Sequence, residues 1–419
     1  MSGADQKELG RRVQAMIDTL ASISAEPGKL TRLFLTPEHK RAANLTGEWM
    51  RRAGLSVRMD AAGTMHGFLP AGGSGPRAGK RLLIGSHIDT VVDAGRYDGN
   101  LGVIAGIVAA EEIRARRIEL PFGLEILAFG DEEGVRFPKT LNGSSTVAGT
   151  LDPAVLDHVD AAGITFRDAL LRFGCDPTAI KDEAYLRADV IGYLELHIEQ
   201  GPVLERAGEA LGVGSAIASQ GRYRLRISGE AGHAGTVPMG LRHDALAAAA
   251  EVMLMVEEIA TRGAKHWLVG TVGEIAVAPG ASNVIPGEAQ FSLDLRAADD
   301  PARSAAATEI RGRIRQIGAR RGVIIGMETV HEKPVAVAAP RLKRAIAAGI
   351  ESVTGKRPRE LMSGAGHDGQ AMIHLTDIGM IFVRCRAGIS HNPLEFVELD
   401  DLGLAVEALV RTVEQIAGE

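Results

Sequence analysis

The chain has 419 residues, 45% of them hydrophobic and 24% charged, which is typical of a soluble globular protein with two or three domains. Its 47 basic and 53 acidic residues give a net charge of −6, so we expect no binding to nucleic acid. The longest apolar run, from Leu101 to Ala110, is too short to span a membrane. The sequence opens without an apolar secretion signal and has only two cysteines, Cys175 and Cys385, so we expect a cytoplasmic protein.

Two helices and a strand are predicted in the N-terminal part of the chain. An amphipathic pattern predicts the first helix over residues 6–25. The second is predicted over residues 37–53, because Thr36 can cap its first turn and Pro37 suits the first helical position. The residues that follow Gly54 read LSVRMD and predict a strand.

Four short apolar runs predict strands that are buried on both faces. Each run is unbroken rather than alternating with polar residues, as in the inner strands of a parallel sheet. Helical sequence separates several of them, for example from Leu101 to Arg116. This alternation indicates an α/β fold, in which helices flank both faces of a mostly parallel sheet. The runs are RLLIGS from residue 81, LEILAFG from residue 124, VIGYLEL from residue 190 and MIFVRC from residue 380.

The middle of the chain has a different pattern, which predicts an inserted domain over residues 214–330. Polar and apolar residues alternate from Tyr223 to Ser228, as in a strand with one exposed face. The element order β-α-β-β-α-β is that of an α+β sandwich. We expect residues 1–213 and 331–419 to form the catalytic domain, and the inserted domain to offer a dimer interface. The other predicted elements are helices over 242–262 and 301–319 and strands over 266–275, 288–296 and 323–330.

Side chains that can bind metals follow all four apolar runs. Ligands of open α/β sheets bind beyond the carboxyl ends of the strands. We therefore expect these side chains to converge, although they lie far apart in the sequence. They are His87 and Asp89 after the first run, Glu132 and Glu133 after the second, His197 and His391 after the third and fourth, and Asp98 in the loop before the helix at residue 101.

A cluster of carboxylates and imidazoles is expected around cations, because neighbouring carboxylates repel one another. Two divalent ions would remove this repulsion, and ligands with nitrogen and oxygen but no sulfur suit zinc, manganese, cobalt or nickel. The sequence therefore predicts two metal ions bridged by Asp98, with Asp89 holding the imidazole of His87. One ion would be completed by His87 and His197, and the other by Glu133 and His391.

Several motifs around these residues occur together and in order along the chain. They are GSHIDTV at 85–91, RYDGNLGV at 96–103, DEEGVRF at 131–137, LHIEQGPVLE at 196–205, GHAGTVPM at 232–239 and GISHNP at 388–393. With these motifs the chain resembles the M20 family of dinuclear metallohydrolases and, more narrowly, its hydantoinase/carbamoylase amidase subfamily. That subfamily includes N-carbamoyl-L-amino-acid hydrolases, β-ureidopropionases and allantoate amidohydrolases.

The resemblance implies a di-metal catalytic domain with an inserted dimerisation or lid domain. It implies that Glu132 is the general base and that the five metal ligands are those reached above, namely His87, Asp98, Glu133, His197 and His391. Relatives that cleave ureides carry a histidine at the position of His197, whereas aminoacylases and dipeptidases usually carry a carboxylate there.

The activity implied is hydrolysis of the linear C–N bond of an N-carbamoyl-L-amino acid, which gives the amino acid, ammonia and carbon dioxide. Allantoate amidohydrolase and β-ureidopropionase fit the same motifs, so the small ureido substrate stays open. His197 disfavours a peptidase, and the presence of Glu132 argues against a non-catalytic binding protein.

Four residues of the inserted domain and one glycine of the catalytic domain match substrate-binding positions of the subfamily. His233 would stabilise the oxyanion, reaching in from the partner subunit of a homodimer. Arg296 would bind the substrate carboxylate through two hydrogen bonds. Gln220 and Asn283 would also contact the substrate, and Gly366 would let backbone amides approach it.

Overall fold

The computed structural model describes residues 3–419 and contains two compact units. The first unit is built from the chain up to Ser215 and from Val337 onward, and the second from Ala216 to Ala336. The sequence placed these boundaries at residues 214 and 330. The second boundary lies later because strand β13 (Ile324–Lys333) stays paired with its neighbour up to Lys333.

A nine-stranded sheet runs through the first unit. Its strands are β1 (Ser56–Met59), β2 (Met65–Leu69), β3 (Arg81–His87), β4 (Gly123–Phe129), β5 (Val190–Ile198), β6 (Leu211–Ile217), β14 (Ala336–Val337), β15 (Glu360–Ser363) and β16 (Ile378–Val383). The four inner strands, in the order β4-β3-β5-β16, run parallel to one another, and antiparallel strands flank them. The predicted α/β fold with a mostly parallel sheet is therefore confirmed.

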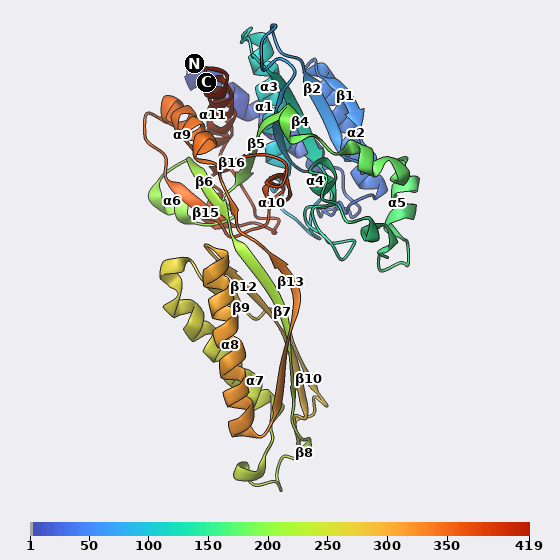
Figure 1. The fold of residues 1–419 in the computed structure, drawn as a ribbon, viewed down its shortest axis with the longest axis vertical. Helices are drawn as coiled ribbons and strands as arrows, with labels where there is room; N and C mark the ends of the chain where they lie inside the picture. The colour runs from blue at the N-terminus through green and yellow to red at the C-terminus, as the bar shows by residue number, and fades with distance from the viewer. Residues whose placement is uncertain (1–2) are drawn as a thin grey trace. The chain divides into compact units, whose positions relative to one another are not determined.

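Helices cover both faces of this sheet (Figure 1). The helices of this unit are α1 (Gly3–Ala21), α2 (Pro37–Arg52), α3 (Asn100–Ala115), α4 (Asn142–Val147), α5 (Phe166–Phe173), α6 (Val203–Ala207), α9 (Pro340–Thr354), α10 (Gly369–Met372) and α11 (Leu399–Ala417). Helix α2 begins as predicted, because the Thr36 hydroxyl accepts a hydrogen bond from the backbone of His39. On the face of β5 opposite to α3, the backbone of Gly369 in α10 donates to Glu195.

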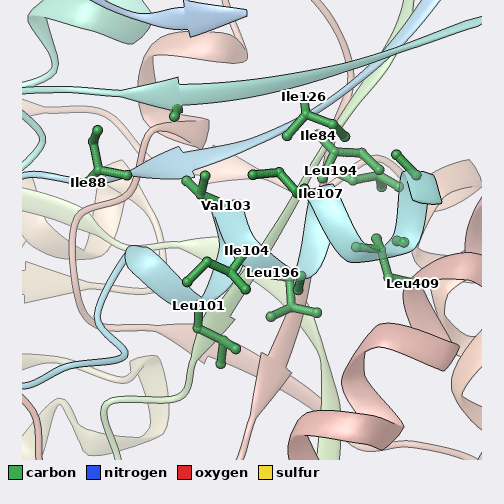
Figure 2. Packing of buried hydrophobic residues seen from close by; sticks show 14 of the residues in the cluster. Ile84, Ile88, Leu101, Val103, Ile104, Ile107, Ile126, Leu194, Leu196 and Leu409 are labelled. Atoms are coloured by element: carbon green, nitrogen blue, oxygen red, sulfur yellow. The ribbon is translucent and has the colours of Figure 1, made fainter. Parts of the chain in front are cut away.

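Helix α3 is enclosed by the core. It packs against β3, β4 and β5 on one side and against α1 and α11 on the other, so its first ten residues carry no polar face. Figure 2 shows Ile107 of α3 among Ile84, Ile126 and Leu194, which come from three adjacent strands. This packing fixes the N-terminal end of α3 beside the carboxyl ends of β3 and β5.

The second unit is an antiparallel sheet with two helices on one face. Its strands are β7 (Ser219–Ser228), β8 (Gly232–His233), β9 (Val269–Thr271), β10 (Ile275–Ala278), β11 (Val284–Ile285), β12 (Glu288–Ala297) and β13, and its helices are α7 (Ala245–Arg262) and α8 (Asp300–Arg321). The strand order is β10-β12-β7-β13, with β9 also paired to β12 and with β8 and β11 forming a separate pair. Apolar residues of α7 and α8 form the core of this unit with one face of the sheet.

One predicted strand of the second unit is wrong. The sequence predicts a single strand over residues 266–275, but the structure has a 3-10 turn at Ala264–His266 followed by the separate strands β9 and β10. The break falls at Glu274, whose backbone exchanges hydrogen bonds with Ser292. Other 3-10 turns cover Pro153–Asp157, Pro177–Glu183, Arg187–Asp189, Met239–Leu241 and Arg386–Gly388.

Across residues 3–419, the helices are all too short or too polar to cross a membrane.

Gly102 allows the close packing of α3 on β5, and we expect its replacement by alanine to lower the stability of the protein. A Cβ at this position would overlap the backbone oxygen of Leu196 and lie 2.7 Å from the Cβ of Ser86. We expect Gly102→Ala to cost at least about 2 kcal/mol of unfolding free energy, measured by urea titration. Gly312→Ala in α8 is the matched control, because its Cβ would meet no atom within 4 Å. The control should be neutral or stabilising by up to about 1 kcal/mol, and equal losses in both variants would contradict this account of α3.

Candidate active site

The carboxyl ends of the four parallel strands bring six titratable side chains together. Among them are two groups of three residues, and within each group the candidate ligand atoms lie within 4.8 Å of one another. The first group is His87, Asp98 and His197, and the second is Asp98, Glu133 and His391. His87 ends β3, Glu132 and Glu133 follow β4, His197 lies in β5, His391 follows β16, and Asp98 precedes α3.

Asp98 belongs to both groups and directs one oxygen to each. Its Oδ1 lies 3.1 Å from Nε2 of His197 and 3.6 Å from Nε2 of His87. Its Oδ2 lies 3.2 Å from Nε2 of His391, which is also 3.6 Å from Oε2 of Glu133. This is the arrangement that a carboxylate bridging two cations requires.

The hydrogen bonds of the two buried histidines leave the correct nitrogen for a metal. Nδ1 of His87 lies 3.1 Å from the carbonyl oxygen of Asp89, and Nδ1 of His197 lies 2.9 Å from the carbonyl oxygen of Ile198. A carbonyl oxygen only accepts, so in each neutral ring Nδ1 carries the hydrogen and Nε2 carries the lone pair. Both Nε2 atoms face Asp98, as expected for metal-binding imidazoles.

The charges of the cluster also fit cations. Burial raises the pKa of Glu133 to about 8, and the charges of Asp98 and Glu132 add to the effect. A hydrogen bond with Asp98 raises the pKa of His391 to about 9. Both side chains therefore tend to keep a proton, because the negative charges of the neighbouring carboxylates are offset by added positive charge. Divalent cations would supply this charge in place of the protons, so the residues present fit a metal centre.

Asp89 has a different contact from the one predicted. Its carboxylate oxygen lies 3.6 Å from Nδ1 of His87, too far for a hydrogen bond, and its backbone carbonyl accepts from that ring instead. The carboxylate accepts from the backbone nitrogens of Glu132 at 3.2 Å and Glu133 at 3.3 Å. The backbone turn at residues 88–89 directs the carbonyl to the ring, so the side chain is left to order the loop that carries both glutamates.

Glu132 lies beside the first group and beside the segment that contains Gly366. Its Oε2 is 4.0 Å from Nε2 of His87, and its Oε1 would be 3.2 Å from a Cβ at Gly366. The next residue, His367, is buried, and its ring lies edge-on to the ring of His197, with 4.4 Å between the ring centroids. The structure therefore brings the proposed base and the proposed substrate-binding glycine together.

In the second unit, Gln220 and Arg296 are cross-strand partners that share one carboxylate. They pair directly in the ladder of β7 and β12. Asp294 accepts from Nε of Arg296 at 2.8 Å and from its Nη2 at 2.9 Å, and it also accepts from Gln220 at 3.0 Å. Asp294 was not predicted from the sequence, and its carboxylate fixes the orientation of both predicted substrate-binding side chains.

His233 and Asn283 lie side by side in the short pair of β8 and β11. His233 pairs with Val284, and the carbonyl oxygen of Asn283 accepts from the backbone of Ala234. Nδ1 of His233 accepts from the backbone nitrogen of Gly235 at 3.0 Å. The neutral ring therefore carries its hydrogen on Nε2 and can donate it to an oxyanion.

Three residues around Asp98 were missed by the sequence analysis. Gln200 and Ser390 donate hydrogen bonds to Oδ2 of Asp98, and Glu395 accepts from the backbone of Asp98. Both lie within motifs quoted above: Gln200 is three residues after His197, and Ser390 directly precedes His391. Proximity to a ligand in the sequence was therefore a usable signal for these two, but not for Glu395.

Comparisons with known proteins find relatives over nearly the whole chain. A profile of peptidase family M20/M25/M40 matches residues 83–415. An allantoate deiminase of Arabidopsis thaliana is 42% identical over 429 residues, which cover 96% of this chain and 81% of that protein. An N-carbamoyl-L-amino acid amidohydrolase of Geobacillus stearothermophilus is 39% identical over 97% of this chain and 98% of its own length. A solved hydantoinase/carbamoylase family amidase from Burkholderia multivorans has a TM-score of 0.89 and 29% identity over 98% of both chains.

The fold, the site and these matches define the class: the chain belongs to peptidase family M20/M25/M40. Within this family it is a hydantoinase/carbamoylase amidase, an enzyme that hydrolyses carbon–nitrogen bonds other than peptide bonds. The resemblance identified from the sequence motifs is confirmed.

The raised pKa values predict that metal uptake releases protons. Glu133, with a pKa of about 8, and His391, with a pKa of about 9, both hold a proton at pH 7 in the metal-free protein, and a cation must displace it. Affinity for Mn²⁺ should therefore rise from pH 6 to pH 8, and calorimetry at pH 7 in buffers of different ionisation enthalpy should detect the released protons. His391→Ala should show a weaker dependence on pH. An affinity that is constant between pH 6 and pH 8 would contradict the prediction.

Proposed function

We propose that this enzyme hydrolyses the terminal ureido group of a small carboxylate, foremost an N-carbamoyl-L-amino acid. One water is consumed, the bond between the carbonyl carbon and the amino-acid nitrogen breaks, and the products are the amino acid, ammonia and carbon dioxide. The observation that carries the proposal is Asp98, whose two oxygens each face one group of candidate metal ligands while Glu132 lies beside them.

Two divalent ions would be held by His87, Asp98 and His197 on one side and by Asp98, Glu133 and His391 on the other. Nitrogen and oxygen ligands support zinc, with manganese, cobalt and nickel as alternatives that cellular supply would select. When bound, such ions lower the pKa of a water molecule and polarise a carbonyl group.

Glu132 is the proposed general base and then the general acid. Its carboxylate would take a proton from the attacking water and pass it to the departing nitrogen of the amino acid. The carbonyl oxygen of Asp89 holds the ring of His87, and the carboxylate of Asp89 orders the loop of Glu132, so one residue positions both a ligand and the base. His233 is the proposed donor to the oxyanion, through its Nε2 hydrogen.

Arg296 is the proposed partner of the substrate carboxylate, with Gln220 and Asn283 as further contacts. Asp294 holds the guanidinium of Arg296 through Nε and Nη2 and so sets the plane in which the group can bind a second carboxylate. A ureido compound without a carboxylate would lose this interaction, which supports an amino-acid derivative as the substrate.

The register of the second unit supports a homodimer. Gln220 and Arg296 pair at one end of the ladder of β7 and β12, and Ser228 and Glu288 pair at the other. The eight residue steps from Gln220 to Ser228 span about 26 Å, and β8 with His233 follows beyond that far end (Figure 1). A small substrate cannot touch both ends of one unit. We infer that His233 and Asn283 serve the site of a partner subunit.

Allantoate is the second candidate substrate, because the Arabidopsis thaliana allantoate deiminase is more identical to this chain than the Geobacillus stearothermophilus amidohydrolase is. Allantoate also carries ureido groups and a carboxylate, so the same residues would serve. Ammonia release from N-carbamoyl-L-methionine, N-carbamoyl-β-alanine and allantoate, compared as kcat/KM, decides between them. If the enzyme releases ammonia from none of these three compounds, the proposal is rejected.

The two free, buried thiols, Cys175 and Cys385, support the proposed cytoplasmic location.

Replacement of the proposed base should separate chemistry from metal binding. We expect Glu132→Gln to lower kcat at least about 100-fold, because the amide cannot accept the proton, while two metal ions stay bound. Metal content is measured by elemental analysis and kcat by ammonia release. Glu119→Gln, an exposed glutamate of the same unit, is the control and should keep full activity. Near-normal activity of Glu132→Gln would remove this residue from the mechanism.

Replacement of Arg296 should act on substrate binding alone. We expect Arg296→Lys to raise KM about 10- to 100-fold with little change in kcat, because a lysine cannot make two parallel hydrogen bonds to a carboxylate. Arg224→Lys on β7 is the matched control, since Arg224 is exposed and one strand away. If the two variants have the same KM as the parent, Arg296 does not bind the substrate carboxylate.

A further inference from the structure

We infer that Gln200, Ser390 and Glu395 form a clamp that positions the bridging carboxylate of Asp98 and controls the second metal group, Asp98 with Glu133 and His391. The inference rests on the proposed metal centre and assigns a role to three residues that are not themselves ligands. All three lie in loops beyond the strand ends. They are positioning residues, because they act through Asp98 and the chain next to His391.

Asp98 needs such support because it lies in a loop rather than in a strand. Residues 96–99 form the turn before α3 and make no sheet hydrogen bonds. The side chain of Asp98 must nevertheless direct Oδ1 toward His87 and His197 and Oδ2 toward His391. Displacement of Oδ2 would remove the carboxylate oxygen that faces the second group.

Glu395 connects the two loops that carry Asp98 and His391. One oxygen of its carboxylate accepts from the backbone nitrogens of Tyr97 at 2.7 Å and Asp98 at 3.1 Å. The other oxygen lies 3.0 Å from the hydroxyl of Ser390, directly before His391. Glu395 is 3% exposed and fits against Gly95, where a Cβ would overlap its carboxylate. The carboxylate thus sets the spacing between the two loops.

Ser390 and Gln200 complete the clamp on a single oxygen. The hydroxyl of Ser390 lies 2.8 Å from Oδ2 of Asp98, and Nε2 of Gln200 donates to the same oxygen at 2.9 Å and to the hydroxyl of Ser390 at 3.1 Å. The two hydrogens of the Gln200 amide account for its two contacts, and the single hydroxyl hydrogen of Ser390 is shared between Oδ2 of Asp98 and the carboxylate of Glu395.

The clamp is asymmetric with respect to the two metal groups. Gln200 and Ser390 contact Oδ2, the oxygen that faces His391 and Glu133, and neither has a hydrogen bond to Oδ1 among the described contacts. The first group has its own supports, which are the carbonyl oxygens that hold the Nδ1 atoms of His87 and His197. Loss of the clamp should therefore weaken one of two metal equivalents and leave the other.

The test is a Mn²⁺ titration of the metal-free protein, with free Mn²⁺ measured by electron paramagnetic resonance. His391→Ala identifies the equivalent that belongs to the second group, because it removes a ligand of that group only. We expect Ser390→Ala to weaken this same equivalent about 10-fold and to leave the other within about twofold, a size typical of residues that support metal ligands. Ser390→Ala removes no backbone partner and should fold normally.

Glu395 offers a rescue experiment. Glu395→Ala should weaken the second equivalent at least as much as Ser390→Ala. Glu395→Gln should restore it to within about threefold of the parent, because its amide oxygen can still accept from the backbone of residues 97 and 98. Glu398→Gln is the control, since Glu398 is an exposed partner of Arg386 on the same segment.

Three results would overturn the clamp: unchanged affinity of both equivalents in Ser390→Ala, equal weakening of both, or no recovery in Glu395→Gln relative to Glu395→Ala. These results are distinct from failure of the proposed function. If the parent enzyme itself does not bind two ions, the metal centre is wrong; if it binds two and the variants show one of the three results, only the clamp is wrong.

Discussion

The constraint that dominates the first unit is the repulsion between carboxylates at the carboxyl ends of its parallel strands. Asp98, Glu132 and Glu133 converge there, with Asp98 buried and the two glutamates partly buried, and in the metal-free protein burial and this repulsion raise the pKa of Glu133 to about 8. Three imidazoles face these carboxylates and take part of the charge. A cluster of this kind is costly without cations, so its presence is itself an argument for a metal centre.

The parallel sheet explains how residues that are distant in the sequence reach these strand ends. Four parallel strands end side by side, and each delivers one or two polar residues to the same place. Helix α3 contributes by packing: its apolar residues are held against β3 and β5, so the loop with Asp98 that precedes it lies at the strand ends. The rigid part of the unit thus fixes ligand positions, and the loops need only local hydrogen bonds to fix side-chain orientation.

Sequence patterns could predict what depends on periodicity and on strand ends. The four buried strands, the cap of α2 and the convergence of His87, Glu133, His197 and His391 all follow from such local features. Contacts made across loops could not be predicted. The sequence does not show that the carbonyl oxygen of Asp89, rather than its carboxylate, holds His87, because that depends on the backbone path of the turn. The role of Glu395 could not be predicted either, because its partners Tyr97 and Asp98 are almost 300 residues earlier in the sequence.

The prediction of the short strands β9 and β10 failed for a different reason. Residues 272–274 interrupt what reads as one strand at 266–275, because the four residue steps from Thr271 to Ile275 lie opposite only three steps from Asp294 to Phe291 on β12. Pairing of this kind is a tertiary property, and the preference of the local sequence for a strand cannot reveal where the pairing stops.

The division of residues between the two units bears on how one family handles different ureido substrates. The candidate metal ligands and Glu132 all belong to the first unit, whereas Gln220, Asp294 and Arg296 belong to the second. The ladder of β7 and β12 holds these three side chains together independently of the metal ligands. If Arg296 binds the substrate carboxylate as proposed, substitutions in this ladder would change that binding without disturbing the cluster around Asp98. Relatives with different substrates can on this basis share one metal centre, and the motifs around that centre cannot by themselves distinguish an N-carbamoyl-L-amino acid from allantoate.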